Sequence, residues 1–138
     1  MNQPAVDVEL ADGIAQFYAD PLGHVLFSYP WGSGQLEGFE GPDGWASDFL
    51  NEVGDEVISR GFDGHTAVDP IQFSTASGHG IGKSALTAWL IRWIMDTRPF
   101  SKGIVTANTS EQLRTKTWAE LAKWHHMGIT KHWWTLNA

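Results

Sequence analysis

The sequence of 138 residues contains no cysteine, which excludes disulfide bonds and cysteine-ligated metal sites and favours an intracellular setting. It also has no uninterrupted apolar run of membrane-spanning length. The segment from Met1 to Asp12 carries acidic side chains and no basic one, so it does not resemble a secretory signal. We therefore expect a protein without a membrane partner.

Basic residues are almost missing from the front half of the chain. Up to Pro70 there are thirteen acidic residues against a single basic one, Arg60, whereas three acidic residues face eight basic ones from Ile71 onward. The halves carry −12 and +5, which together give the net charge of −7. This division fits a back half that binds a polyanion, or two halves that complement each other within one fold. The overall acidity argues against tight nucleic-acid binding by this chain alone.

The most informative motif is the glycine-rich stretch Ser-Gly-His-Gly-Ile-Gly-Lys-Ser at 77–84. It follows an apolar run at 71–75 and precedes a long apolar helix pattern over 83–96. A strand, a glycine loop and a helix in this order are typical of a phosphate-binding loop. Lys83 would reach the β- and γ-phosphates, and the Ser84 hydroxyl would ligate Mg²⁺. Ser77 replaces the glycine of the strict pattern, and the alternative is a glycine-rich turn that caps a helix.

Further elements are predicted on both sides of this motif. Before it, we expect a helix over 6–18 that ends near Asp20-Pro21, an ordered aromatic loop over 22–42, and a helix from Asp43 to Gly61. After it, we expect a second strand at 103–107 and a helix that a capping box at 109–112 begins and Gly128 closes.

This order of elements predicts an α/β fold, a parallel sheet flanked by helices, with the later strands missing. Eight tryptophans need more packing partners than so few elements supply, so we interpret the chain as the front part of a larger P-loop NTPase domain. The acidic residues after Ser84 are Asp96, Glu111 and Glu120, all in predicted helices. Hydrolysis needs an acidic residue at a strand end, so we expect nucleotide binding without turnover by this chain alone.

Several segments, in this order and spacing, resemble the N-terminal part of the large terminase subunit of tailed bacteriophages. They are residues 17–25, 29–32, 41–45, 48–50, 77–84, 105–109 and 112–114, so the likeness covers nearly all of the chain. The phosphate loop alone indicates only a P-loop NTPase. The loop together with the upstream Tyr29-Pro30-Trp31 and Pro42-x-x-Trp45 segments is far more specific.

The resemblance implies a motor that uses ATP and Mg²⁺ to drive double-stranded viral DNA into an empty capsid. It implies that 1–65 leads into the ATPase, that 66–138 is the first half of its core, and that the nuclease domain is absent. Lys83 would be the catalytic residue, and Ser84 would ligate the metal. The nucleotide would be bound by Ser77, Gly78, His79, Gly80, Ile81, Gly82, Lys83, Ser84 and Ala85.

The family's partners would be the portal and the small terminase subunit, with a homo-oligomeric ring for the full-length protein. The protein would be located in the host cytoplasm and, transiently, at the procapsid portal. Many relatives carry a glutamine that reads adenine where this chain has Ala46, which leaves adenine selectivity open. The segment 106–112 resembles a motif that faces nucleic acid in helicase-like motors. Arg114, Lys116 and Lys123 would extend that basic face or form a solvated helix face.

Two other functions fit the same sequence. The chain could be a non-catalytic module that docks to the portal or the small terminase subunit through its acidic front half. It could also be a fragment of another P-loop protein, such as a helicase-like protein or a small-molecule kinase.

Overall fold

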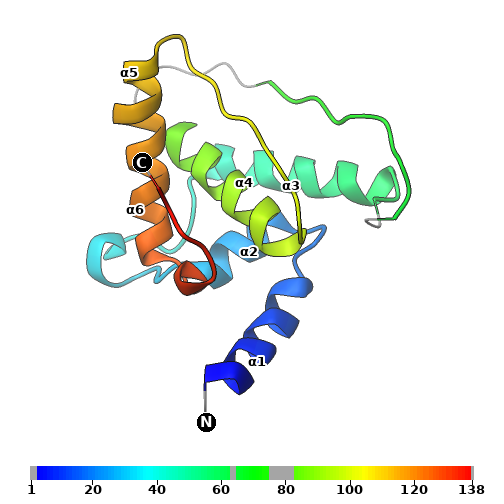
Figure 1. Ribbon diagram of the computed structural model, residues 1–138, viewed down its shortest axis with the longest axis horizontal. Helices are drawn as coiled ribbons and strands as arrows, with labels where there is room; N and C mark the ends of the chain where they lie inside the picture. The colour runs from blue at the N-terminus through cyan, green and yellow to red at the C-terminus, as the bar shows by residue number, and fades with distance from the viewer. Residues whose placement is uncertain (1–2, 63–64, 75–82, 138) are drawn as a thin grey trace.

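The computed structural model describes residues 3–62, 65–74 and 83–137, and within these ranges the chain folds into helices joined by turns and coil (Figure 1). The longer helices are α1 (Gln3–Ala15), α2 (Pro21–Ser28), α3 (Gly44–Ser59), α4 (Lys83–Thr97) and α6 (Ala119–Met127). The shorter elements are η1 (Gly34–Leu36), α5 (Ser110–Gln112), the π-helical η2 (Leu113–Trp118) and η3 (Lys131–Trp133). Figure 1 shows α5, η2 and α6 as one continuous rod.

The prediction of an α/β fold with a parallel sheet, a partial P-loop NTPase core, is wrong for the described residues. The segments predicted as strands, 71–75 and 103–107, run there as extended coil, and Thr75 lies outside the described ranges (Figure 1). A strand needs a neighbour that pairs with its backbone N–H and C=O groups. Neither segment has such a neighbour among the described residues, and Ile104 is 92% exposed. A short apolar run alone does not distinguish a paired strand from coil.

The segment predicted as an aromatic loop begins instead with helix α2. Asp20 and Pro21, interpreted as a helix end, start this helix: Pro21 occupies its first turn, and the Asp20 side chain accepts a 2.9 Å hydrogen bond from the Gly23 amide. Proline suits a first helical turn because the missing N–H would have no partner there. The expected packing of aromatic rings is confirmed in part, since Tyr29 is buried while Phe39 is 55% exposed.

Helix α4 lies at the centre of the molecule, in contact with α6, α2 and α1. Its Leu86 and Trp89 are buried in a core that also contains Val25 of α2, Leu50 of α3 and Trp124 of α6. The core therefore joins residues from before and after the glycine-rich stretch. Full burial of side chains of this size stabilises a fold by about 1.5–3 kcal/mol each.

Indole rings occupy the middle of this core. The ring centroids of Trp89 and Trp124 are 5.1 Å apart, and Trp31 lies 5.8 Å from Trp124 and 6.1 Å from Trp89. The Trp31 indole donates a 3.0 Å hydrogen bond to the Val25 carbonyl oxygen, so its polar atom is satisfied inside the core. We name Trp31, Trp89 and Trp124 the indole cluster.

Helix α3 confirms the predicted amphipathic helix and its end. Val53 and Val57 are buried while Glu52 and Asp55 are exposed. Gly61 follows the helix with a φ of +67°, a left-handed conformation that glycine adopts without steric cost.

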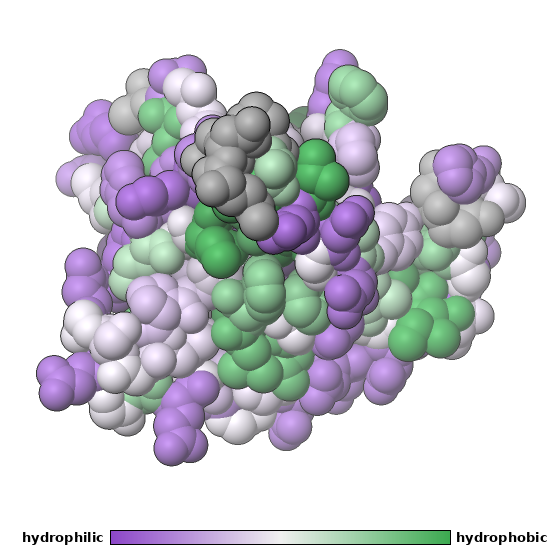
Figure 2. Space-filling view, turned by 90° about the horizontal axis from the view of Figure 1, so that it is seen from below, coloured by the Kyte–Doolittle hydropathy of each residue, from purple (hydrophilic) through white to green (hydrophobic). Residues whose placement is uncertain are grey.

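Helix α1 extends away from the other helices (Figure 1). Ile14, 1% exposed, is its buried residue among the described side chains. Figure 2 looks at the molecule from this end and shows apolar patches set among polar side chains. Val8 of α1 and Leu26 and Phe27 of α2 are among the exposed apolar residues of these helices.

Candidate functional site

Two of the predicted phosphate-binding residues begin helix α4. Lys83 and Ser84 lie in its first turn with exposed side chains, whereas Ala85 is buried in the core. The predicted residues Ser77, Gly78, His79, Gly80, Ile81 and Gly82 lie outside the described residues. The predicted long helix from Lys83 is confirmed, and it brings an ammonium group and a hydroxyl group to one helix end.

The charge at this helix end is unusual. A helix N-terminus carries a partial positive charge and favours acidic side chains. The first turn of α4 contains no acidic residue and instead carries the cation of Lys83. The helix dipole and the Lys83 ammonium group are both positive here, so an anion near this end of α4 would be stabilised.

The other end of α4 contains a buried polar cluster that the sequence did not indicate. Asp96, predicted only as a helix residue, has a fully buried carboxylate. It lies 2.9 Å from His24 Nε2, accepts a 2.8 Å hydrogen bond from the Thr130 hydroxyl, and accepts a 2.7 Å hydrogen bond from the Trp134 indole. Arg92 donates a 2.6 Å hydrogen bond to Thr130 and has its Nη2 3.7 Å from Asp96 Oδ1. We name these five residues the Asp96 cluster.

The cluster keeps Asp96 ionised. Burial alone would raise the pKa of this carboxyl group, but the hydrogen bond from His24 and the charge of Arg92 hold it below its usual range. The cluster joins α2, α4 and the chain after α6 at one point. A buried charge is tolerated only when it is paired and hydrogen-bonded in this way.

The cluster is not arranged for nucleophilic catalysis. A serine, histidine and aspartate triad uses the two ring nitrogens separately, one for each partner. Here Nε2 of His24 lies within hydrogen-bond distance of both Asp96 and the Ser28 hydroxyl (3.3 Å), while Nδ1 has no partner among the described residues. Ser28 is itself 4% exposed. The arrangement therefore serves structure.

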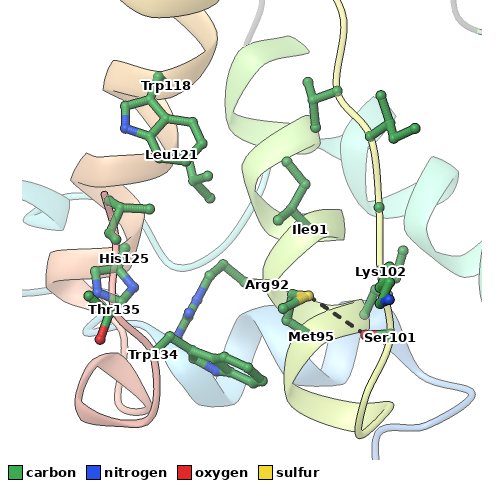
Figure 3. A pocket seen from close by; sticks show the side chains of 15 residues that line it. Ile91, Arg92, Met95, Ser101, Lys102, Trp118, Leu121, His125, Trp134 and Thr135 are labelled. Atoms are coloured by element: carbon green, nitrogen blue, oxygen red, sulfur yellow. Dashed lines mark hydrogen bonds between the residues drawn. The ribbon is translucent and has the colours of Figure 1, made fainter. Parts of the chain in front are cut away.

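A pocket opens beside this cluster, between α4, α6, residues 101–105 and the residues 134–136 (Figure 3). Its volume is about 420 Å³. Figure 3 shows Trp118 and Leu121 on the α6 side, Arg92 and Met95 on α4, and Lys102 on the coil opposite α6.

His125 also lines this pocket and is 6% exposed. Burial, together with the nearby charge of Arg92, lowers the pKa of His125 below its ordinary value. Its imidazole is therefore neutral at pH 7, so it can donate or accept a hydrogen bond without adding charge.

Other predicted residues lie on the rod formed by α5, η2 and α6. Thr109 accepts a 3.0 Å hydrogen bond from the Gln112 amide, which confirms its role as a helix cap. Arg114 and Lys116 are exposed, and Lys123 lies 3.9 Å from Glu120 and 5.3 Å from the ring of Trp124. Ala46, the position discussed for adenine recognition, is 2% exposed in the core.

Searches for similar proteins return no match to a family model, a curated protein or a solved structure. Within the described ranges, no group of three potential metal ligands lies close enough together to hold an ion. The described helices include none with the length and apolar character of a membrane span.

Proposed function

We propose that this chain is the N-terminal ATP-binding segment of a viral DNA-packaging motor, the large terminase subunit. It binds Mg-ATP through the loop from Ser77 to Ser84 and does not hydrolyse it alone. Its partners in the assembled motor are double-stranded viral DNA, the portal, the small terminase subunit and further copies of itself. The motor works in the host cytoplasm and at the procapsid portal. The proposal rests on the sequence motif and on the positions of Lys83 and Ser84 in α4.

The observation that carries the proposal is that Lys83 and Ser84 lie in the first described turn of α4. A phosphate-binding loop places its lysine and its hydroxyl residue at the N-terminus of the following helix, where the amides and the dipole face the anion. The exposed side chains of Lys83 and Ser84, with no acidic residue in the same turn, fit that role.

The position of Asp96 supports the expectation that this chain alone does not hydrolyse ATP. Asp96 is thirteen residues along α4 from Lys83, which corresponds to about 20 Å of helix, and it is held in a buried cluster. Asp96 is therefore not available to complete a Mg²⁺ shell at Ser84 or to orient an attacking water.

Nucleotide titration with Lys83→Ala and Lys131→Ala variants tests the proposal. Lys131 is an exposed lysine at the distant element η3, so its variant controls for the loss of one positive charge. We expect saturable Mg-ATP binding to wild type, at least about tenfold weaker binding to Lys83→Ala, and unchanged binding to Lys131→Ala. Ser84→Ala should remove the dependence on Mg²⁺. Equal affinity of wild type and Lys83→Ala for Mg-ATP would contradict the proposal.

A further inference from the structure

The pocket between α4 and α6 has the size and lining of a small-ligand site. Its volume of about 420 Å³ lies within the range of about 300–1,000 Å³ that ligand pockets occupy. Most of its lining side chains are apolar, including Ile91, Leu121 and Leu136. Two indoles, Trp118 and Trp134, also line it (Figure 3). Indole faces and edges favour contact with a planar ring.

The charged side chains that line the pocket are positive. Arg92 and Lys102 line it, and the described lining residues include no carboxylate. Arg92 already pairs with the Asp96 carboxylate and donates a hydrogen bond to the Thr130 hydroxyl. Lys102 is exposed on the coil, and no ion pair between described residues involves it. A ligand that brings a negative charge near Lys102 therefore gains an ion pair that no described carboxylate makes.

We propose that this pocket binds a small planar aromatic anion, with its ring beside Trp118 and Trp134 and its charged group near Lys102. The site is separate from the proposed phosphate site. Residues 83 and 92 are about 14 Å apart along the axis of α4, so the two sites occupy different parts of the same helix. The inference therefore does not depend on nucleotide binding.

A pair of fluorescent probes tests the inference with the whole chain. Anilinonaphthalene sulfonate is a planar aromatic anion, and phenylnaphthylamine has the same aromatic body without the sulfonate. We expect the sulfonate to bind with one-to-one stoichiometry and more tightly than phenylnaphthylamine. The near-ultraviolet circular dichroism of the tryptophans, measured in parallel, verifies that the native packing is kept.

Three variants locate the site. Lys102→Gln removes the positive charge of Lys102 and should weaken sulfonate binding by about fivefold, while leaving phenylnaphthylamine binding unchanged. Arg60→Gln removes the same charge from the end of α3 and should change neither. Val105→Trp, on the coil that lines the pocket, fills the cavity with a larger ring and should abolish binding of both probes.

Some results would overturn the inference. Equal affinity for the two probes, or equal effects of Lys102→Gln and Arg60→Gln, would show that the pocket has no preference for an anion. Unchanged binding to Val105→Trp would show that the probes bind another apolar surface. Loss of sulfonate binding in a natively packed Lys83→Ala variant would place the probe at the phosphate site instead, and would leave the nucleotide proposal standing.

Discussion

The indole Nε1 of Trp134 donates a 2.7 Å hydrogen bond to Asp96 Oδ1, across 38 residues of sequence. This bond holds the end of the described chain on α4. The same carboxylate contacts His24 from α2, so three separate parts of the chain meet at one buried charge. Removal of that charge should therefore destabilise the whole fold.

The first prediction concerns the stability that Asp96 supplies. Asp96→Ala should lower the free energy of unfolding by about 3–5 kcal/mol, because it leaves the buried Arg92 without its counter-charge. Urea denaturation followed by tryptophan fluorescence measures the loss. Glu111→Ala, which removes an exposed carboxylate from α5, is the control and should change stability by less than about 0.5 kcal/mol. A similar loss in both variants would contradict the role assigned to the cluster.

The second prediction concerns pH. The pKa of Asp96 is lower in the folded chain than its unfolded value of about 3.9, so ionised Asp96 stabilises the fold above that pH. This contribution is lost as the pH falls from about 4 through the folded pKa. The stability difference between wild type and Asp96→Asn, taken from urea midpoints, should therefore shrink between pH 6 and pH 3. A difference that stays constant over this range would show that the ionisation of Asp96 does not stabilise the fold.

The third prediction concerns the contact between α3 and the start of α2. A Cβ atom on Gly54 would lie 2.8 Å from the Ala19 carbonyl oxygen and 3.1 Å from Cδ of Pro21. Gly54→Ala should therefore destabilise the fold by about 1–3 kcal/mol, because the backbone would have to move. A Cβ on Gly44, at the start of the same helix, would meet no atom within 4 Å. Gly44→Ala should be neutral or slightly stabilising, and thermal unfolding of both variants measures the contrast.

The helices that could be predicted from the sequence are those fixed by local chemistry. Helix α3 has buried apolar residues on one face and ends at Ser59, two residues before Gly61, and α4 follows the glycine-rich stretch as expected. Helix α2 was missed because the Asp20-Pro21 pair was interpreted as an end, although the same pair caps a beginning. The strand predictions failed because a strand depends on a neighbour that short apolar runs cannot identify.

The Asp96 cluster was beyond prediction for a different reason. Asp96 reads as one more polar residue on a helix, and nothing near it in sequence indicates burial. Its partner His24 is 72 residues away, and Thr130 is 34 residues away. The packing of α2 and α6 against α4 brings these groups together. The pocket beside the cluster is also formed by segments distant in sequence, so its lining residues carried no common signal.

The indole cluster has a consequence for spectroscopy. With ring centroids only 5.1 to 6.1 Å apart, the strong far-ultraviolet transitions of Trp31, Trp89 and Trp124 couple to one another. Their coupled transitions will add a band of their own to the far-ultraviolet circular dichroism, so the ellipticity of this protein will misstate its helix content. The same band will vanish as soon as the rings move apart, which makes it a sensitive optical reporter of the native core.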